Sequence, residues 1–455
     1  MSNILFISLG CDKNLVDSEK MLGLLGESGH RIVQEESEAD VIVINTCCFI
    51  HDAKEESIET IIEMGQWKEK GRLKGLVVTG CLAQRYAEEI EEALPEVDAI
   101  VGTTGYTDIT AVIDEVLAGC RKKDSGLYSC LPSVDLLPAS LSDKRVVTTG
   151  GYTAYLKIAE GCDKRCSYCI IPYIRGRYRS FPMEDLLAEA RSLAEQGTKE
   201  LILVAQETTV YGMDLYGRKA LPDLLRGLAA IDGIEWIRLL YCYPEEITDE
   251  LVSVMKEEKK ICHYLDMPIQ HSEDRILRRM GRKTDRAELE GLVGMLRREI
   301  PDLVLRTTLI TGFPGETEED FEHMMGFVDR MEFDRLGVFP YSAEEGTPAA
   351  GMKNQVPQET RIRRRDEIMA LQQEISADLS ARKIGQIMPV LIEGYLYEEN
   401  VYVGRTYMDA PKVDGNVFVS AQEELISGEI VPVQITGANE YDLMGDVYYA
   451  DEFTK

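Results

Sequence analysis

Short apolar runs alternate with helix-like segments along most of this chain, and this alternation limits the possible fold more than any other feature. In the first 118 residues the apolar runs span 4–9, 40–44, 75–79 and 97–101, and a helical pattern follows each run. Alternating β and α segments are typical of an α/β fold built on a parallel sheet. We therefore expect an N-terminal doubly wound parallel sheet.

The same alternation resumes at residue 152 and continues to about residue 342. Its six candidate strands span 154–159, 201–205, 236–241, 264–267, 304–310 and 335–339. Six βα units suit an incomplete (β/α)6 barrel, whose active site would lie at the carboxyl ends of the strands. A long helix is expected next, because apolar residues from Ile368 to Leu379 recur at helical spacing.

The last 70 residues have a different pattern. Four short apolar segments separated by glycines predict a small antiparallel β-barrel, with strands over 390–392, 401–403, 417–419 and 430–435. Residues from about 119 to 150 show no sustained periodicity, which indicates a linker. The expected units are therefore an N-terminal domain, a linker, a central domain and a C-terminal barrel, at residues 1–120, 121–150, 151–384 and 385–455.

Composition limits the location and the partners of the protein. No run of about 20 apolar residues could span a membrane, and residues 1–7 read as a strand without the features of a signal peptide, so we expect a cytoplasmic protein. Fifty Lys and Arg against eighty Asp and Glu give a net charge of −30. Such a chain repels a phosphate backbone, so nucleic acid is not expected as its main substrate, whereas a basic protein partner is favoured.

Eleven cysteines in a chain without an export signal favour metal or redox chemistry over a disulfide scaffold. One cysteine follows each of the first three apolar runs, namely Cys11, Cys47 or Cys48, and Cys81. The carboxyl ends of parallel strands meet at one sheet edge, so we expect these three thiols to be neighbours there. Adjacent residues of an extended chain point in opposite directions, which allows one of Cys47 and Cys48 to face the site. The alternative is that each is a buried core thiol.

A second group of cysteines has the spacing C-x3-C-x2-C, formed by Cys162, Cys166 and Cys169. Three thiolates in one short loop can hold three irons of a four-iron cluster and leave the fourth iron open to a small molecule. The alternative is a structural zinc site or a buried thiol cluster. Zinc would need a fourth ligand, and no other Cys or His occurs within twenty residues on either side.

This loop, placed after the first strand of a six-unit barrel, resembles that of the radical S-adenosylmethionine (SAM) enzymes. The resemblance implies that the open iron binds SAM. It also implies that one-electron reduction cleaves SAM to a 5′-deoxyadenosyl radical, which abstracts hydrogen from an unreactive carbon.

The segments 8–14, 45–47 and 80–82 resemble those of the methylthiotransferase family, and the C-terminal barrel is similar to its TRAM domain. The resemblance implies two 4Fe-4S clusters. Cys162, Cys166 and Cys169 would hold one cluster. Cys11, Cys47 and Cys81 would hold an auxiliary cluster, with Cys48 as a packing residue. It also implies that SAM is both the methyl donor and the radical source.

Four further segments, 154–162, 205–209, 268–271 and 341–348, resemble the RimO branch of this family, which methylthiolates the β-carbon of an aspartate in ribosomal protein S-twelve. Residues 386–451 contain twelve acidic and two basic residues, which suits a barrel that binds a basic protein. Two alternatives stay open: a transfer-RNA adenosine methylthiotransferase, and an iron–sulfur electron-transfer or binding protein without turnover. An electron donor such as flavodoxin is implied as a further partner.

The remaining candidate residues have weaker signals. Gln206, Thr308 and Gly312 are candidate cofactor-binding residues. The Thr308 to Gly315 segment ends a strand and opens a helix, and its glycines would let the backbone approach SAM, although a tight turn without a ligand fits equally well. Glu207 stands where the branch has aspartate, and Gly150-Gly151 stand where prolines are expected. The arginines at 175, 177 and 179 suit either an acidic electron donor or a solvated charge run, the latter being preferred. We assign no catalytic role to His271 and no site to Cys120, Cys130, Cys242 and Cys262.

Overall fold

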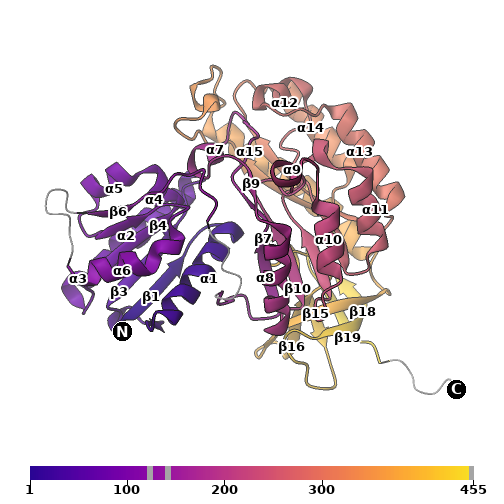
Figure 1. Cartoon of the computed structure of the whole chain (residues 1–455). Coiled ribbons are helices and arrows are strands. Elements are labelled where there is room, and N and C mark those ends of the chain that lie inside the picture. The colour runs from indigo at the N-terminus through magenta and orange to yellow at the C-terminus, as the bar shows by residue number, and fades with distance from the viewer. Residues whose placement is uncertain (120–126, 139–144, 450–455) are drawn as a thin grey trace.

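The computed structural model describes residues 1–119, 127–138 and 145–449, and it contains the three expected units (Figure 1). The N-terminal unit, indigo to purple in Figure 1, is a sheet between helices. The central unit, magenta to orange, carries the open barrel, and the small closed barrel, yellow, lies beneath it. No helix in the described part of the chain is long and apolar enough to span a bilayer.

The N-terminal sheet has six strands in the order β2-β1-β3-β4-β5-β6, and every neighbouring pair is parallel. Its strands are β1 (Asn3–Ser8), β2 (Arg31–Val33), β3 (Val41–Thr46), β4 (Gly75–Gly80), β5 (Ala99–Val101) and β6 (Tyr128–Cys130). Its helices are α1 (Asp12–Glu27), α2 (His51–Gly65), α3 (Trp67–Lys70), α4 (Cys81–Arg85), α5 (Ala87–Ala93) and α6 (Ile109–Leu117). The doubly wound parallel sheet is therefore confirmed.

Both faces of this sheet are covered, which explains why its strands read as continuous apolar runs. All six residues of β3 are buried. Val41 and Val43 belong to the core that contains residues of α1 and α6, whereas Ile42 and Ile44 belong to the opposite core that contains residues of α2 and α5. The period-two alternation of a strand thus supplies two cores at once.

The central unit is an open sheet of six parallel strands in the order β14-β13-β12-β11-β10-β7, and it confirms the incomplete barrel. Its strands are β7 (Thr153–Lys157), β10 (Glu200–Val204), β11 (Trp236–Leu239), β12 (Ile261–Asp266), β13 (Val304–Thr311) and β14 (Arg335–Pro340). Its helices are α7 (Ile171–Ile174), α8 (Met183–Glu195), α9 (Met213–Tyr216), α10 (Leu221–Ala229), α11 (Asp249–Glu257), α12 (Asp274–Met280), α13 (Arg286–Glu299), α14 (Glu318–Met331) and α15 (Gln358–Ala381).

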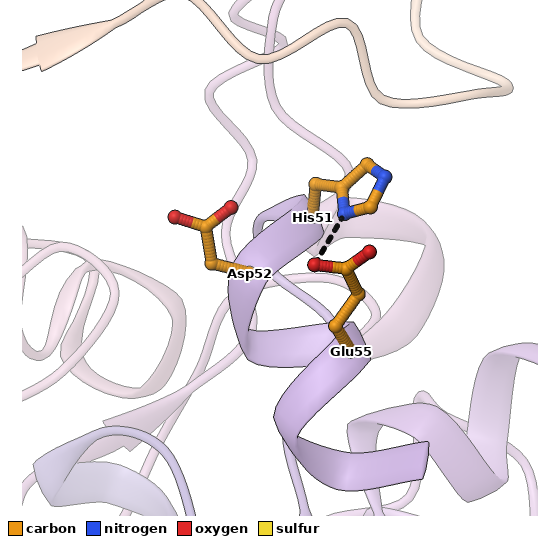
Figure 2. Close-up of side chains that lie close together, drawn as sticks. All are labelled: His51, Asp52 and Glu55. Carbon is orange, nitrogen blue, oxygen red and sulfur yellow. Dashed lines mark ion pairs between the residues drawn. The ribbon is translucent and has the colours of Figure 1, made fainter. Parts of the chain in front are cut away.

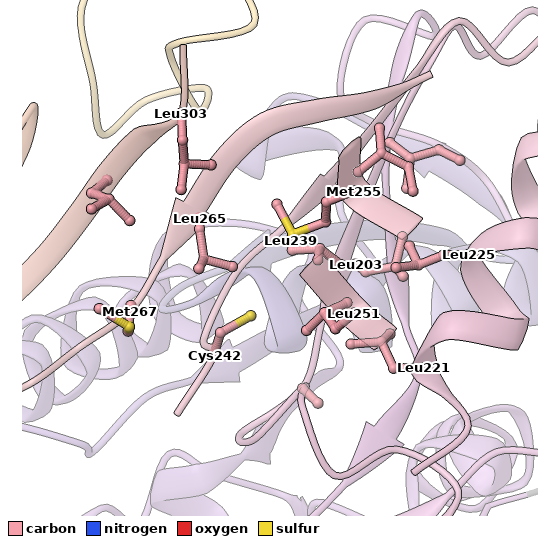
Figure 3. Close-up of a cluster of buried hydrophobic side chains, with 14 of the residues drawn as sticks. Leu203, Leu221, Leu225, Leu239, Cys242, Leu251, Met255, Leu265, Met267 and Leu303 are labelled. Carbon is pink, nitrogen blue, oxygen red and sulfur yellow. The ribbon is translucent and has the colours of Figure 1, made fainter. Parts of the chain in front are cut away.

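The main core of the central unit lies between this sheet and its outer helices. Figure 3 shows leucines of β10, β11 and β12 facing leucines of α10 and α11, with Cys242 among them. Cys242 is fully buried there, and Cys262 is buried in a second apolar cluster on the other face of the sheet. Cys130 lies half-buried in β6, and Cys120 lies outside the described residues.

The C-terminal unit is a closed barrel of five strands in the order β15-β16-β17-β19-β18. Its strands are β15 (Ile387–Leu396), β16 (Val401–Arg405), β17 (Val417–Ser420), β18 (Ile430–Ala438) and β19 (Leu443–Val447). The expected small barrel is confirmed, but its β17–β19 pairing is parallel where all pairings were expected to be antiparallel. The barrel is fixed to the central sheet by the buried Arg405, which donates to Glu200 at 2.7 Å.

Two features differ from the sequence expectation. The segment predicted as a linker contributes β6, whose three residues pair with β5 and extend the N-terminal sheet. Strands β2 and β19 also have no counterpart in the predicted elements. The domain boundaries at residues 120, 150 and 384 stay predictions.

Candidate active site

Three cysteines follow three adjacent strands of the N-terminal sheet. Cys11 comes after β1, Cys47 after β3 and Cys81 after β4, and these strands are neighbours in the sheet. The strand order reverses between β1 and β3, and α/β sheets bind ligands in the crevice outside the carboxyl ends at such a point. The three residues therefore lie at the edge of the sheet where a ligand is expected.

Cys47 lies close to the turn that carries Cys11. A Cβ atom at Gly10, which has a φ of +91°, would lie 3.2 Å from Sγ of Cys47, so Cys47 packs against the residue that precedes Cys11. Burial, together with the neighbouring thiols of Cys81 and Cys11, raises the pKa of Cys47 to about 12. None of the three forms a disulfide. Burial also raises the pKa of Cys81. Thiols placed at one edge of a sheet suit a metal centre, because metal binding drives their deprotonation.

Cys48 differs from Cys47 in its surroundings. Its side chain is fully buried, and it belongs to the apolar cluster on the α2 side of the sheet. Its backbone carbonyl accepts a hydrogen bond from Arg85 at 3.4 Å. Cys81 belongs to the same cluster, so the role of Cys48 as a packing residue stays a prediction.

The second group of cysteines lies in a loop of the central unit that is closed at its base. Two short antiparallel strands, β8 (Ala159–Glu160) and β9 (Arg179–Ser180), pair on either side of the loop. Cys162, Cys166 and Cys169 line one cavity of about 250 Å³. Burial raises the pKa of both Cys162 and Cys169 to about 12.

The donor set of this cavity fits an iron–sulfur cluster better than zinc. Its described lining residues include no Cys or His beyond the three thiols. Three thiolates satisfy three irons of a four-iron cluster, whereas a structural zinc site takes four protein ligands. The arrangement therefore supports the cluster hypothesis, with one iron left for a small molecule.

One buried arginine joins the two cysteine groups. Arg175 follows α7, directly after the cluster loop, and is 2% exposed. Its Nη2 donates to Sγ of Cys81 at 3.6 Å and to Oδ1 of Asn14, while its Nη1 donates to Asp17 at 2.9 Å and to Glu160 at 3.1 Å. A residue of the central unit thus contacts a candidate ligand of the N-terminal unit.

The sequence interpretation of the three arginines is therefore wrong for Arg175, which is neither solvated nor available to an electron donor. Its neighbours differ: Arg177 is exposed, and Arg179 is half-buried. The sequence does not distinguish these arginines from one another. In the structure, the turn after α7 directs the side chain of Arg175 into the interface, where its guanidinium group contacts three oxygen acceptors and one thiol.

The interface around Arg175 is a buried ion network. Lys157 of β7 contacts both Asp17 of α1 and Glu160 of β8. Burial on its own would raise the pKa of Glu160, but Arg175 and Lys157 outweigh it and lower this pKa to about 2. Two carboxylates and two cations therefore balance one another between the sheet and the barrel.

Two predicted residues follow β10 at the barrel mouth. Nε2 of Gln206 donates to Glu160 at 3.1 Å, and Oε1 of Gln206 is buried without a hydrogen-bond partner among the described residues. Glu207 is almost fully buried, and burial raises its pKa to about 7. Its Oε2 lies 3.9 Å from Lys164 of the cluster loop. Buried polar atoms without partners, placed beside the loop, suit a ligand-binding position.

The Thr308 to Gly315 segment has few free groups. The carbonyl of Thr308 accepts from Gln270 at 2.8 Å, and the N–H of Gly312 donates to Glu316 at 2.8 Å. A Cβ atom at Gly312 would lie 2.2 Å from Cγ of Arg361 on α15. These contacts fit the tight-turn alternative, and the roles of Thr308 and Gly312 toward SAM stay predictions.

Sequence reasoning missed Lys13 and Tyr241, which meet between the two units. Nζ of Lys13, near the start of α1, lies 3.1 Å from the centre of the Tyr241 ring. Tyr241 follows β11 and has a φ of +61°, a backbone conformation that residues other than glycine rarely adopt. The sequence signal that could have identified Lys13 as a site residue is its position two residues after Cys11.

A further group of ligand-type side chains lies at the start of α2. Figure 2 shows His51, Asp52 and Glu55 on the first turn, with Nδ1 of His51 3.6 Å from Glu55. All three side chains are exposed. The pair at positions i and i+4 is an ordinary surface ion pair of a helix, so we assign it no metal.

Comparisons with known families match all three units. Residues 3–102 match a family described as "Uncharacterized protein family UPF0004", residues 156–328 match the radical SAM superfamily, and residues 384–447 match the TRAM domain. These matches follow the order of the three units in the structure.

Curated relatives cover nearly the whole chain. The ribosomal protein uS12 methylthiotransferase RimO of Lachnoclostridium phytofermentans is 61% identical over 97% of this chain and 99% of its own length. The protein of the same name from Clostridioides difficile is 50% identical over 99% of both chains. Among solved structures, the radical SAM methyltransferase TsrM of Kitasatospora setae has a TM-score of 0.56 at 16% identity, covering 74% of this chain and 73% of its own. That likeness supports the fold.

Proposed function

The chain belongs to the RimO family of ribosomal protein uS12 methylthiotransferases, and from this membership we propose that it modifies the β-carbon of an aspartate in uS12. It is a radical SAM enzyme that uses a 4Fe-4S cluster and SAM. The β-carbon of an aspartate is no acid at neutral pH, so a general base would not activate it. A radical route removes the hydrogen atom directly.

The observation that carries this proposal is the contact between Arg175, which follows the loop cysteines, and Cys81 of the N-terminal group. Three thiols line a cavity at the mouth of the open barrel, and three more follow adjacent strands of the N-terminal sheet. Arg175 contacts Cys81 of the second group from the end of the loop that carries the first. A methylthio transfer needs a radical source and a sulfur source close together, and this arrangement supports both.

We propose two 4Fe-4S clusters in the protein. Cys162, Cys166 and Cys169 would hold the one that, with SAM, supplies the 5′-deoxyadenosyl radical. Cys11, Cys47 and Cys81 would hold the auxiliary one. The role of the protein itself would be to exclude water and to hold the two cluster sites in a fixed relative position. The buried contacts of Arg175 to Asp17 and Glu160 support that second task.

The C-terminal barrel is proposed as the docking surface for uS12. Six of its acids are exposed: Glu398, Glu399, Glu423, Glu424, Glu429 and Asp446. Arg405 is buried against Glu200 and Glu393, so Lys412 is its one exposed base among the described residues. This surface attracts a basic ribosomal protein and repels transfer RNA, which disfavours the RNA-modifying alternative.

The electron donor is proposed to be a small acidic protein such as flavodoxin, acting in the cytoplasm. The cavity that contains the three loop cysteines is also lined by the exposed side chains of Arg165, Tyr173 and Arg177. Two arginines and an exposed tyrosine beside a cluster site suit an acidic partner.

The test is an anaerobic assay with purified, reconstituted protein, SAM, a reductant, and either uS12 or transfer RNA. We expect 5′-deoxyadenosine to form and uS12 to gain one SCH3 group in place of one hydrogen, read by mass spectrometry. Product on RNA alone would overturn the substrate proposal. Absence of 5′-deoxyadenosine would favour a protein that binds clusters without turnover.

Iron analysis tests the two cluster sites separately. Replacing Cys11, Cys47 and Cys81 together by alanine should remove one four-iron cluster and leave the other, and the same change at the loop cysteines should do the reverse. Cys242→Ala is the matched control, because this thiol is buried in the apolar core of the central unit. Unchanged iron content in either triple variant would contradict the assignment of its ligands.

A further inference from the structure

Buried cations in this protein are almost always paired with an acid. Ten Lys and Arg side chains are buried in the described part of the chain. Nine of them have a carboxylate oxygen within 4.0 Å; these are Lys20, Arg145, Lys157, Arg175, Arg238, Arg282, Arg335, Arg364 and Arg405. The tenth is Lys13, which is 6% exposed and has no ion pair with any described residue.

The position of Lys13 is unfavourable for a cation. It is the second residue of α1, where the helix dipole already presents partial positive charge. Burying an ammonium group without a directly paired counter-charge is costly. Its described contact is the ring of Tyr241, 3.1 Å from Nζ, and that residue is held in a strained backbone conformation. The charges of Cys11, Asp12 and Asp266 act favourably on the ammonium group, but none of these described residues forms an ion pair with it.

Lys13 lies where the two halves of the candidate site meet. It comes two residues after Cys11, and Tyr241 stands at the carboxyl end of β11 in the open barrel. The N–H of Tyr241 donates to Asp266 at 3.0 Å, and its hydroxyl donates to Asp12 at 3.3 Å, so the ring beneath Nζ is fixed from both units. A ligand held by this ammonium group would sit between the auxiliary thiols and the barrel mouth.

We infer that Lys13 binds the side-chain carboxylate of the aspartate that the enzyme modifies. This inference rests on the proposed function. The carboxylate is bonded directly to the reacting β-carbon. Holding the carboxylate in place therefore also holds the β-carbon and its hydrogens in place. The other buried cations nearby are already neutralised: Arg175 and Lys157 share Asp17 and Glu160. Lys13 is thus a substrate-binding residue that selects aspartate over asparagine, because the neutral amide leaves its charge unpaired.

The experiment measures binding of two fluorescein-labelled peptides to the full, reconstituted chain by anisotropy. Both peptides carry the uS12 segment around the target residue, one with aspartate and one with asparagine there. We expect the parent to bind the aspartate peptide about 100-fold more tightly. Lys13→Met, which keeps the length of the side chain and removes the charge, should lose that preference, while its affinity for the asparagine peptide stays within about 3-fold of the parent's. Lys13→Arg should keep part of the preference.

Lys20→Met is the matched control, since Lys20 is a buried lysine of the same helix that is paired with Glu189. It should retain the preference for aspartate even if the protein is less stable. Iron content, measured in a chain whose loop cysteines are replaced, should be unchanged in Lys13→Met.

Three results would overturn the inference. A parent with equal affinity for both peptides, measured without any variant, would exclude selection by charge. A Lys13→Met chain that keeps the preference would exclude Lys13 as its source. A Lys13→Met chain that weakens both peptides equally and has a lower iron content would make Lys13 a residue of the cluster site. Failure of the proposed function gives a different result, because the parent would then methylthiolate neither the aspartate peptide nor intact uS12.

Discussion

Replacing Arg175 with methionine removes the guanidinium group that joins the two halves of the site and keeps a side chain of similar length. In the parent, Nη1 contacts Asp17 at 2.9 Å and Glu160 at 3.1 Å. In the variant, Lys157 is the one described cation that still pairs with these two buried carboxylates. Asp17 and Glu160 therefore each lose one of the two cations that form an ion pair with them.

The expected loss follows from the titration of Glu160. Burial would raise its pKa, but Arg175 and Lys157 lower it from 4.5 to about 2, and a difference of this size corresponds to about 3 kcal/mol at neutral pH. Breaking a buried ion pair costs about 3–5 kcal/mol in other proteins. We therefore expect Arg175→Met to lose about 3 kcal/mol at pH 7. A carboxyl whose folded pKa is lowered stabilises above its unfolded pKa, so the loss should shrink as the pH falls from 4.5 towards 2.

Urea unfolding of the cluster-free, reduced chain measures this loss. The two tryptophans report on separate units, because Trp67 lies in α3 of the N-terminal unit and Trp236 begins β11 of the central unit. Arg177→Met is the matched control, since Arg177 is an exposed arginine of the same segment and forms no ion pair with a described residue. The reasoning would be refuted if both variants lost the same stability, or if the loss from Arg175→Met were equal at pH 7 and at about pH 3.

Three other outcomes follow from the structure. Burial raises the pKa of Glu207 to about 7, so the parent should lose stability as the pH rises from 4.5 to 7, and Glu207→Gln should remove that loss in urea midpoints taken across the range. Gly312→Ala places a Cβ atom 2.2 Å from Cγ of Arg361 at a φ of +70°. It should cost about 1–3 kcal/mol, and an unchanged unfolding midpoint would contradict this. Reversing the exposed charges of Glu423 and Glu424 to lysine should weaken binding of uS12 about 3- to 10-fold at low salt and less at high salt, measured by anisotropy.

The parts of the fold that followed from the sequence are those with long apolar runs. Each of the six strands of the open barrel was located to within a few residues, and in β7, β10 and β11 every residue is buried, which leaves a nearly continuous apolar signal. Strands β2 and β6 were missed because they are largely exposed or half-buried, whereas the equally short β5 is fully buried and was located. Their places are fixed by pairing with β1 and β5, which is information outside their own sequence.

The candidate site likewise contains residues that the sequence predicts and residues that it does not. The cysteines were found because their spacing and their positions after strands are regular. Arg175 was assigned the wrong role and Lys13 was not singled out, because a basic residue gives no signal of where its side chain points, and the acids that pair with Arg175 include Asp17, 158 positions away. Helix α1 was misleading in particular, since a polar stripe normally faces water and here it is buried. Tertiary contacts reversed the usual meaning of that pattern.

The buried stripe of α1 has a consequence for biosynthesis. It consists of Lys13, Asn14, Asp17, Ser18, Glu19 and Lys20. The N-terminal unit leaves the ribosome before the barrel that will cover this stripe has been made. A charged stripe stays hydrated during that interval, whereas an apolar one would invite premature association of nascent chains. The charged residues of this stripe therefore keep the N-terminal unit hydrated until the central unit has been synthesised and packs against it.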